Sequence, residues 1–402
     1  MRSGASVPVS RYYRPELDVL RFLAYLLVFF NHTLPTKTHP SVFVDHFLRG
    51  LAPAFYGSLA VTRYGLSLFF TLSAFLICEL LIREREIAGT VGIKQFYIRR
   101  ILRIWPLYYF ALTLGVIFAF LPGGDRSEII GIGWFAIFMG AWHSSLYGFI
   151  GNPVAPLWSI SVEEQFYLLA PWAVKCFNRK LLYGFCALLI VVASAELYHF
   201  GRTSATWYRI WGDSFVQFEC FAAGILLCLV LRGRVPRMAA WKRLILIISW
   251  CLCWEASDYG LHYRYVHASV SPGCWPLMGS YALAPLGAVL LIVAFLGADP
   301  KLLPRWATYL GRISFGLYVY HEFALAITHA LGLDSLNLAK IPNYALQAFL
   351  TGGLKLGIPF GLTVLMAALS YRYFETPFLK MKARHAVIQS QPVGAITDRS
   401  VP

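Results

Sequence analysis

An arginine and a histidine interrupt the first apolar segment of the chain, residues 17–34. Arg21 and His32 are eleven positions apart, and a helix that turns by about 100° per residue returns over that distance to within about 20° of its starting direction. Ionisable groups at membrane depth cost about 2.5–3.5 kcal/mol each, so they are rare unless they have a function. An imidazole can accept a proton or act as a nucleophile near neutral pH. We therefore expect Arg21 and His32, with Arg14 and Asp18 close to the same face, to form one wall of a polar path.

Basic residues precede the third apolar segment, where Arg99, Arg100 and Arg103 stand close together. On a helix Arg100 and Arg103 are neighbours at a spacing of three, and Arg99 and Arg103 at a spacing of four. Such a compact cationic group could hold phosphate groups at the cytoplasmic surface. The alternative is that these arginines only anchor the helix on the cytoplasmic side. Composition does not decide between the two.

Acidic residues open the fourth apolar segment. Ser161 and Glu164 have the spacing of a capping box, in which each side chain bonds a backbone N–H at a helix start. A capping box does not require the second acid, Glu163, or the tyrosine at position 167. Polar residues that enter the membrane are expensive unless they line a cavity. We therefore expect part of this segment to face a cavity.

Two more polar groups occur late in the chain. His321 lies in the ninth apolar segment, and we interpret it as a helix-packing group in preference to a catalyst. Glu375 precedes Pro377, which should end the last helix and leave the carboxylate at its cytoplasmic mouth. The alternative for Glu375 is that it simply neutralises Arg372.

The apolar composition predicts a membrane protein. Of the 402 residues 58% are hydrophobic and 14% charged, which is too little polar surface for a water-soluble globule. We therefore expect an all-α, polytopic transmembrane helical bundle of about ten spans, in one domain over residues 1–380, with residues 381–402 as a disordered cytoplasmic tail. The stretch 129–141 is short and contains glycine, so it should form a re-entrant or interfacial helix. The ten apolar runs lie at 17–34, 64–82, 104–121, 162–178, 181–198, 215–231, 241–256, 279–297, 313–332 and 344–371.

The basic residues fit this topology. The formal net charge is +15, but the basic residues recur in short clusters between apolar runs, which is typical of topology signals and does not indicate nucleic-acid binding. With both termini cytoplasmic, the inner segments hold 25 Lys and Arg and the outer segments 8. Counting residues 129–141 as a membrane span would reverse the side assigned to every later segment and would remove this difference between inner and outer segments. We expect a multi-pass protein of the inner (plasma) membrane, and the cysteine spacing indicates neither a disulfide framework nor a metal site.

Six segments, in order between residues 14 and 380, resemble the acyltransferase 3 family of membrane acyltransferases. Ala74, where the family often has glycine, and Phe315, where tyrosine is common, are small departures that leave the charged positions unchanged. The segments are Arg14-Pro-Glu-Leu-Asp-Val-Leu-Arg21 followed by His32, Gly65-Leu-Ser-Leu-Phe-Phe-Thr-Leu-Ser-Ala-Phe-Leu-Ile77, Arg-Arg-x-x-Arg-x-x-Pro at 99–106, Trp-Ser-x-Ser-Val-Glu-Glu-Gln-Phe-Tyr at 158–167, Ile-Ser-Phe-x-Leu-Tyr-x-x-His at 313–321 and Phe-Glu-x-Pro at 374–377.

The resemblance implies a ten-helix enzyme that moves an acyl group, usually acetyl from acetyl-CoA, to a hydroxyl of a sugar, glycolipid, peptidoglycan or macrolide. By correspondence, Arg21 and His32 match the family's essential arginine and histidine, Arg100 and Arg103 its paired arginines, and Glu375 its C-terminal glutamate. Whether His32 acts as base or forms an acyl-histidine stays open. The expected site therefore has catalytic residues His32, Arg21, Asp18 and Glu375, donor-binding residues Arg99, Arg100 and Arg103, and supporting residues Arg14, Ser159, Ser161, Glu163, Glu164, Tyr318 and His321.

Acyl-CoA enters this interpretation as a co-substrate, with no permanently bound cofactor and no metal. The expected partners are the lipid bilayer and a carbohydrate, glycolipid or macrolide acceptor. A transporter or flippase of a lipid-linked sugar is the alternative, because intramembrane His, Arg and Glu serve such proteins too. No inverted repeat is visible in the sequence, which counts against it.

Overall fold

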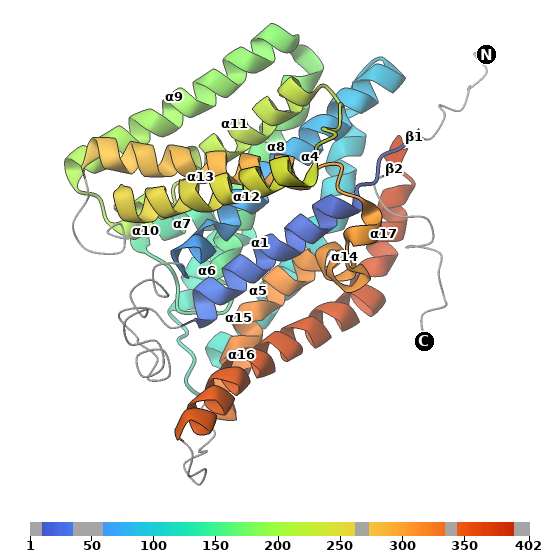
Figure 1. Ribbon diagram of the computed structural model, residues 1–402. Helices are drawn as coiled ribbons and strands as arrows, with labels where there is room; N and C mark the ends of the chain where they lie inside the picture. Colours follow the sequence, from blue (N-terminus) through green and yellow to red (C-terminus); the bar gives the residue numbers. More distant parts are fainter. Residues whose placement is uncertain (1–9, 35–58, 262–272, 334–343, 390–402) are drawn as a thin grey trace.

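The computed structural model describes residues 10–34, 59–261, 273–333 and 344–389 (Figure 1). This part of the chain is helical apart from two short strands. Strand β1 (Ser10–Arg11) pairs in parallel with β2 (Ile388–Gln389), so the two ends of the described chain meet. Of the expected tail, residues 381–389 are described and include β2, and residues 390–402 lie outside the described chain.

A helix lies at each of the ten apolar runs. Six described segments are long and apolar enough to cross a membrane: 61–88, 93–120, 179–203, 214–231, 274–295 and 352–383. Two others, α12 and α15, have 16 and 17 residues, roughly 24–26 Å, so the count of ten spans stays a prediction. The ten helices are α1 (Pro15–Thr33), α4 (Gly65–Ala88), α5 (Ile93–Phe120), α8 (Trp158–Cys176), α9 (Arg179–Thr203), α11 (Ser214–Leu231), α12 (Ala240–Glu255), α13 (Cys274–Phe295), α15 (Ser314–Ala330) and α16 (Tyr344–Leu369).

Shorter elements connect these helices. The stretch 129–141, expected to form one short helix, contains most of α6 (Glu128–Ala136) and the first two residues of α7 (Gly140–Tyr147), and each of these helices is too short to span a bilayer. The remaining elements are α10 (Trp207–Trp211), α14 (Arg305–Arg312), α17 (Thr376–Ala383), the 3-10 turns η1 (Leu59–Tyr64), η2 (Ala155–Leu157) and η5 (Pro300–Leu302), and the π-helical turns η3 (Ala256–Gly260) and η7 (Ser370–Glu375).

Two helix boundaries differ from the sequence prediction. Helix α8 begins at Trp158, directly after the 3-10 turn η2, so Ser161 and Glu164 lie inside the helix and the predicted capping box is wrong. The prediction that Pro377 ends the last helix is also wrong. The chain continues from α16 through η7 into α17, and Pro377 occupies the start of α17, where a missing N–H breaks no intrahelical bond.

Helix α1 lies at the centre of the bundle and positions the first polar residues. It contacts α4, α13, α14 and α15, and it buries Leu17, Leu20 and Tyr25. A Cβ added to Gly311 of α14 would run into the carbonyl oxygen of Asp18. Glycine therefore lets α14 approach the backbone of α1 directly, which is how membrane helices pack most closely.

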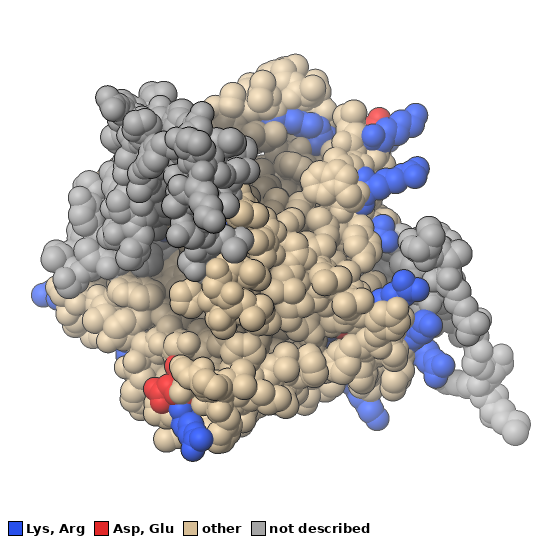
Figure 2. Space-filling model, turned by 90° about the horizontal axis from the view of Figure 1, so that it is seen from below, with Lys and Arg blue, Asp and Glu red and all other residues tan. Residues whose placement is uncertain are grey.

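Lys and Arg side chains gather along one edge of the molecule, at the right of Figure 2. The two views are related by a rotation about the horizontal axis, so this edge corresponds to the side on which β1, β2 and α17 lie in Figure 1. Helix α1 begins at that side and runs toward the opposite one (Figure 1). The two ends of the Arg21 to His32 stripe therefore face opposite sides of the bundle.

Candidate functional site

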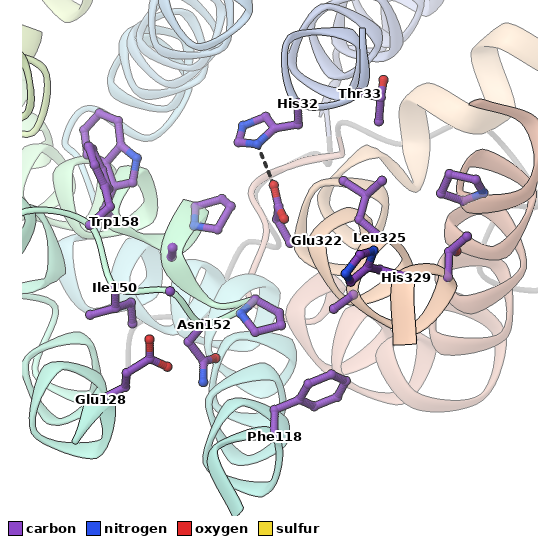
Figure 3. A pocket seen from close by; sticks show the side chains of 18 of the residues that line it. His32, Thr33, Phe118, Glu128, Ile150, Asn152, Trp158, Glu322, Leu325 and His329 are labelled. Atoms are coloured by element: carbon purple, nitrogen blue, oxygen red, sulfur yellow. Dashed lines mark ion pairs between the residues drawn. The ribbon is translucent and has the colours of Figure 1, made fainter. Parts of the chain in front are cut away.

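His32 lies on the wall of a cavity of about 1090 Å³. The cavity is surrounded by α1, α5, α6, α8, α15 and α16, and in Figure 3 the side chains of His32 and Glu322 point toward each other across it. We call this space the histidine cavity. Its polar and aromatic lining includes Asp125, Glu128, Asn152, Trp158, Trp207, Trp211, Glu322 and His329.

Three polar side chains of α1 and α15 form the centre of this site. His32 Nδ1 is 2.5 Å from Glu322 Oε1, and His321 Nε2 is 3.7 Å from the same oxygen. His321 is fully buried, and its Nδ1 is 2.6 Å from the carbonyl oxygen of Tyr318. Because a carbonyl only accepts hydrogen bonds, this contact places the proton on Nδ1 and leaves the His321 Nε2 lone pair facing Glu322 and His32.

The same three residues could hold a metal ion. His32, His321 and Glu322 each offer one ligand atom, and these atoms lie within 4.8 Å of one another. Two imidazoles and a carboxylate suit a divalent transition metal. The sequence-based expectation that the protein uses no metal therefore stays a prediction, and it is testable at this position.

A second cavity, of about 90 Å³, lies at the other end of the stripe. We call it the arginine cavity. Among the described residues the buried Nε atoms of Arg100 and Arg312 have no hydrogen-bond partner. Unpaired buried guanidinium donors are costly, so they favour an anionic ligand here. Six basic residues line the cavity, Arg14, Arg21, Arg100, Arg103, Arg312 and Lys382, against two acids, Asp18 and Glu375.

A third cavity, of about 110 Å³, adjoins the other two, and we call it the middle cavity. It shares Arg21, Arg100 and Arg103 with the arginine cavity, and it shares Leu66 and Tyr318 with the histidine cavity. The three spaces therefore follow one another through the bundle. The separation of Arg21 and His32 along α1 corresponds to about 16 Å of this path.

Hydrogen bonds hold the polar groups of the middle cavity. Tyr167 donates to Glu163 Oε2 at 3.0 Å, and its hydroxyl is 2.7 Å from Ser73 Oγ. The guanidinium of Arg100 lies over the ring of Tyr167 at 5.4 Å. Ser159 bonds the hydroxyl of Tyr318 at 2.7 Å. The expectation that Glu163 and Tyr167 line a cavity agrees with this geometry.

The remaining expected catalytic residues lie at the arginine cavity. Asp18 accepts hydrogen bonds from Arg21 at 3.1 Å and from the Tyr13 hydroxyl at 3.0 Å. Glu375 is buried and accepts from Ser370 Oγ at 3.2 Å. Asp18, Arg21 and Glu375 are thus grouped together, and the length of α1 separates them from His32.

Four expected residues line none of these three cavities: His321, which lies beside His32, and Arg99, Glu164 and Ser161. Arg99 donates to Glu84 Oε2 at 2.7 Å and to the His385 carbonyl at 2.8 Å, so it is turned away from Arg100 and Arg103. Glu164 accepts from the Trp105 indole at 3.3 Å. Ser161 is fully buried inside α8. These residues support the helices around the site.

Sequence reasoning did not assign a role to Glu322, Arg312 or Lys382. The signal for Glu322 was its position beside His321 inside an apolar run, where an acid is expensive. Arg312 and Lys382 were counted only as charges that set the topology. Their approach to Arg100 and Arg103 depends on how α14 and α17 pack against α1 and α5.

Tyr13 and Asp125 are among the titratable groups that line the cavities outside the spanning helices, and both have shifted pKa values. Burial raises the pKa of Tyr13 to about 12, and the neighbouring Asp18 acts in the same direction, so the phenol is a neutral donor to Asp18. At the histidine cavity, hydrogen bonds from the Ser127 side chain and backbone lower the pKa of Asp125. Asp125 therefore carries a negative charge at neutral pH.

Comparison with known proteins identifies the kind of domain present. Residues 14–371 match the family model described as an acyltransferase domain. A protein of Staphylococcus aureus (strain COL), provisionally named an O-acetyltransferase, is 22% identical over 347 residues, which cover 79% of this chain and 52% of that protein. This chain therefore spans about half the length of that relative. No solved structure matches significantly.

Two further relatives differ in how much of their length they share. The peptidoglycan O-acetyltransferase OatA of Listeria monocytogenes is 31% identical over 216 residues, which cover 50% of this chain and 29% of OatA. Nodulation protein 10 of Rhizobium leguminosarum bv. viciae is 24% identical over 404 residues, covering 94% of this chain and 97% of that protein. The similarity to nodulation protein 10 thus covers nearly the whole of both chains.

Proposed function

This chain belongs to the acyltransferase 3 family, and from that membership we propose that it transfers an acyl group, acetyl in the first instance, from cytoplasmic acyl-CoA to a hydroxyl of a carbohydrate-containing acceptor. The observation that carries this proposal is the His32–Glu322 pair on the wall of the 1090 Å³ histidine cavity, with the middle cavity between it and a cluster of basic residues. Relatives named O-acetyltransferase support the reaction class.

Glu322 prepares His32 for proton transfer. An ionised carboxylate can only accept hydrogen bonds, so the 2.5 Å contact fixes the proton on His32 Nδ1 and leaves the Nε2 lone pair available. As a general base, Nε2 takes the proton of the acceptor hydroxyl while the hydroxyl oxygen attacks the thioester carbonyl. The carbon–sulfur bond then breaks, and the CoA thiolate receives the proton. Glu322 acts through His32, as a positioning residue.

His32 could instead carry the acyl group. In that route Nε2 attacks the thioester, the CoA thiolate leaves, and the acceptor hydroxyl then takes the acyl group from the imidazole. Both routes need the same nitrogen and the same orienting contact with Glu322. They differ in whether a covalent acyl-histidine can be isolated in the absence of acceptor.

The basic cluster supports a polyanionic donor. Six cations against two acids give the arginine cavity an excess of positive charge, and its unpaired guanidinium N–H groups suit phosphate oxygens. We propose that the CoA phosphates bind Arg100 and Arg103, with Arg312 and Lys382 in support and Arg21 ordering the entry. The slender pantetheine arm would then follow the middle cavity toward His32, a distance of about 16 Å along α1.

The histidine cavity suits a large polar acceptor. Its volume of about 1090 Å³ exceeds what one acyl group needs. Indole rings can stack on sugar faces, and amide and carboxylate groups bond hydroxyls. We therefore propose a sugar hydroxyl, in a glycan, glycolipid or glycosylated macrolide, as the acceptor group. The alternative role for the aromatic residues is that of a membrane-interface belt.

The charge distribution supports an orientation. The 25 to 8 division of Lys and Arg between inner and outer segments, together with the basic edge in Figure 2, fits termini and arginine cavity on the cytoplasmic side of the plasma membrane. Acyl-CoA is a cytosolic compound, so this orientation places its phosphate site on the side where the donor is available.

Mass spectrometry of glycans, lipids and secondary metabolites tests the proposal. Cells with the gene should contain a compound heavier by one acyl group than its counterpart in cells without the gene. Cells that express His32→Ala at the same level should lack it. An unmodified compound that merely changes compartment would support the transporter alternative and would contradict acyl transfer.

A further inference from the structure

His321 has no part in the proposed acyl transfer, although it is buried beside the reacting histidine. Its ring centroid is 5.1 Å from that of His32, and none of its side chain is exposed. The contact of its Nδ1 with the Tyr318 carbonyl oxygen, at 2.6 Å, fixes the ring proton on Nδ1. The other nitrogen, Nε2, is buried, and no described group donates a hydrogen bond to it. A buried acceptor without a donor is costly, so a ligand that bonds this nitrogen would be favourable.

A cation would also relieve the lone pairs that meet beside His321. Its Nε2 is 3.7 Å from Glu322 Oε1, and both atoms present lone pairs. The same oxygen is 2.5 Å from His32 Nδ1. The ligand atoms of these three residues lie within 4.8 Å of one another. A single divalent ion could therefore bond all three atoms, which the one proton shared by His32 and Glu322 cannot do.

The spacing of these atoms is close to that of a tetrahedral zinc site. Zinc binds nitrogen at about 2.0–2.1 Å and carboxylate oxygen at about 2.0–2.2 Å, so tetrahedral ligand atoms are about 3.3–3.5 Å apart. The 3.7 Å between His321 and Glu322 is near this value, and the 2.5 Å contact of His32 would widen by about 1 Å. The side chains of His32 and Glu322 are 36% and 24% exposed and line the histidine cavity. They therefore have room to adjust, and an ion in the cavity can reach them.

The backbone of α15 already holds His321 as a metal ligand requires. Histidines that bind metal almost always donate their other N–H to a carbonyl or carboxylate, which fixes the tautomer and the orientation of the ring. His321 makes this contact with the Tyr318 carbonyl. Two imidazoles and one carboxylate supply three ligands and leave the fourth position of a tetrahedral ion open.

We propose that His32, His321 and Glu322 form a binding site for Zn²⁺ and that the bound ion inhibits the enzyme. This inference rests on the proposed function, because the reaction it inhibits is the acyl transfer assigned to His32. The ion takes the place of the proton on His32 Nδ1, and a neutral imidazole bound through Nδ1 carries its proton on Nε2. The ring thus changes tautomer without a net loss of a proton. Nε2 then has no free lone pair, so it can neither take the acceptor proton nor attack the thioester.

Cobalt binding to the purified, untagged protein in detergent tests the site without reference to activity. Wild-type protein should bind one Co²⁺ that Zn²⁺ displaces. Its visible spectrum should show nitrogen and oxygen ligands, without the sulfur-to-cobalt band that a cysteine ligand would give. His32→Ala should lose this spectrum, and His321→Ala should weaken the affinity for zinc at least about tenfold, because loss of even an outer partner of a ligand costs 10–100-fold. His321→Gln provides the same measurement if His321→Ala does not fold.

The inhibition is measured as the initial rate of acetyl transfer in inside-out vesicles. Rates are taken before free CoA accumulates, because its thiol binds zinc. Added Zn²⁺ should inhibit the wild-type protein, and a chelator should restore its rate. The zinc concentration for half inhibition should rise at least about tenfold in His321→Ala. His329→Gln is the matched control, since His329 lines the same cavity outside the three ligands, and it should keep the wild-type inhibition.

The outcomes separate this inference from the proposed function. Absence of any CoA-dependent product with wild-type protein would remove the proposed function, while the cobalt spectrum would still report on the site. Equal affinity for Co²⁺ and Zn²⁺ in the wild type and in folded His32→Ala and His321→Ala would overturn the inference, because the ion would then bind elsewhere. An unchanged rate of transfer with zinc bound at His32 would overturn it as well.

Discussion

Replacing Glu322 should slow acyl transfer while leaving donor binding intact. Glu322 Oε1 is 2.5 Å from His32 Nδ1, and Glu322 lines neither the arginine nor the middle cavity. A charge-assisted hydrogen bond contributes about 1.5–3 kcal/mol and a neutral one about 0.5–1.5 kcal/mol. Glu322→Gln keeps a neutral acceptor and so loses about 1–2 kcal/mol, which corresponds to a kcat lower by about 5–30-fold. Glu322→Ala loses the whole bond, and its kcat should fall by about 10–150-fold.

The assay follows labelled acetyl from acetyl-CoA into the acceptor in inside-out vesicles, with the affinity for acyl-CoA measured separately. The affinity should be unchanged in both variants, because the arginine cavity is untouched. Glu128→Gln is the matched control, since Glu128 lines the same cavity in a different helix: a weakened acceptor contact there should raise the KM for the acceptor and leave kcat unchanged. If Glu322→Ala kept more than half of the wild-type kcat, the view that this carboxylate orients His32 would be wrong.

The other expected outcomes concern the base, the donor site, the metal and the topology. His32→Ala should lower turnover by at least about 10²–10⁴-fold with expression and acyl-CoA binding retained, whereas His321→Ala should cost less activity and more thermal stability; more than a tenth of wild-type turnover in His32→Ala would refute the catalytic assignment. The double substitution Arg100→Ala and Arg103→Ala should weaken acyl-CoA binding at least about tenfold, and Arg99→Ala, whose side chain is turned to other partners, should weaken it little; equal losses would return all three arginines to an anchoring role. Treatment of purified protein with a strong chelator should leave acyl transfer unchanged, and activity that is lost and then restored by one divalent metal would establish a metal site at His32. A cysteine placed at position 90 should resist an impermeant thiol reagent in intact cells, and labelling there would contradict a cytoplasmic arginine cavity.

The helices and the order of the polar groups along them could be predicted from the sequence. Apolar runs mark each of the ten long helices because a backbone in lipid must satisfy its own hydrogen bonds, and a helix does so locally. The residues at which the helices begin and end could be predicted less well. Ser161 and Glu164 have the spacing of a helix start, but the 3-10 turn before Trp158 begins the helix earlier. Such a turn depends on the backbone around Pro156, which a capping pattern does not encode.

The grouping of side chains was decided by the tertiary structure. The spacing of Arg21 and His32 fixed their common face, because helical periodicity is a local property. That His32 meets Glu322, nearly three hundred positions later, depends on the packing of α15 against α1. Arg99 binds Glu84 and does not line the arginine cavity with Arg100 and Arg103. Arg312 and Lys382, from other helices, line that cavity instead. Hydrophobicity says which segments enter the membrane but not which helices become neighbours, since lipid is as apolar as their surfaces, and close packing of side chains makes that choice.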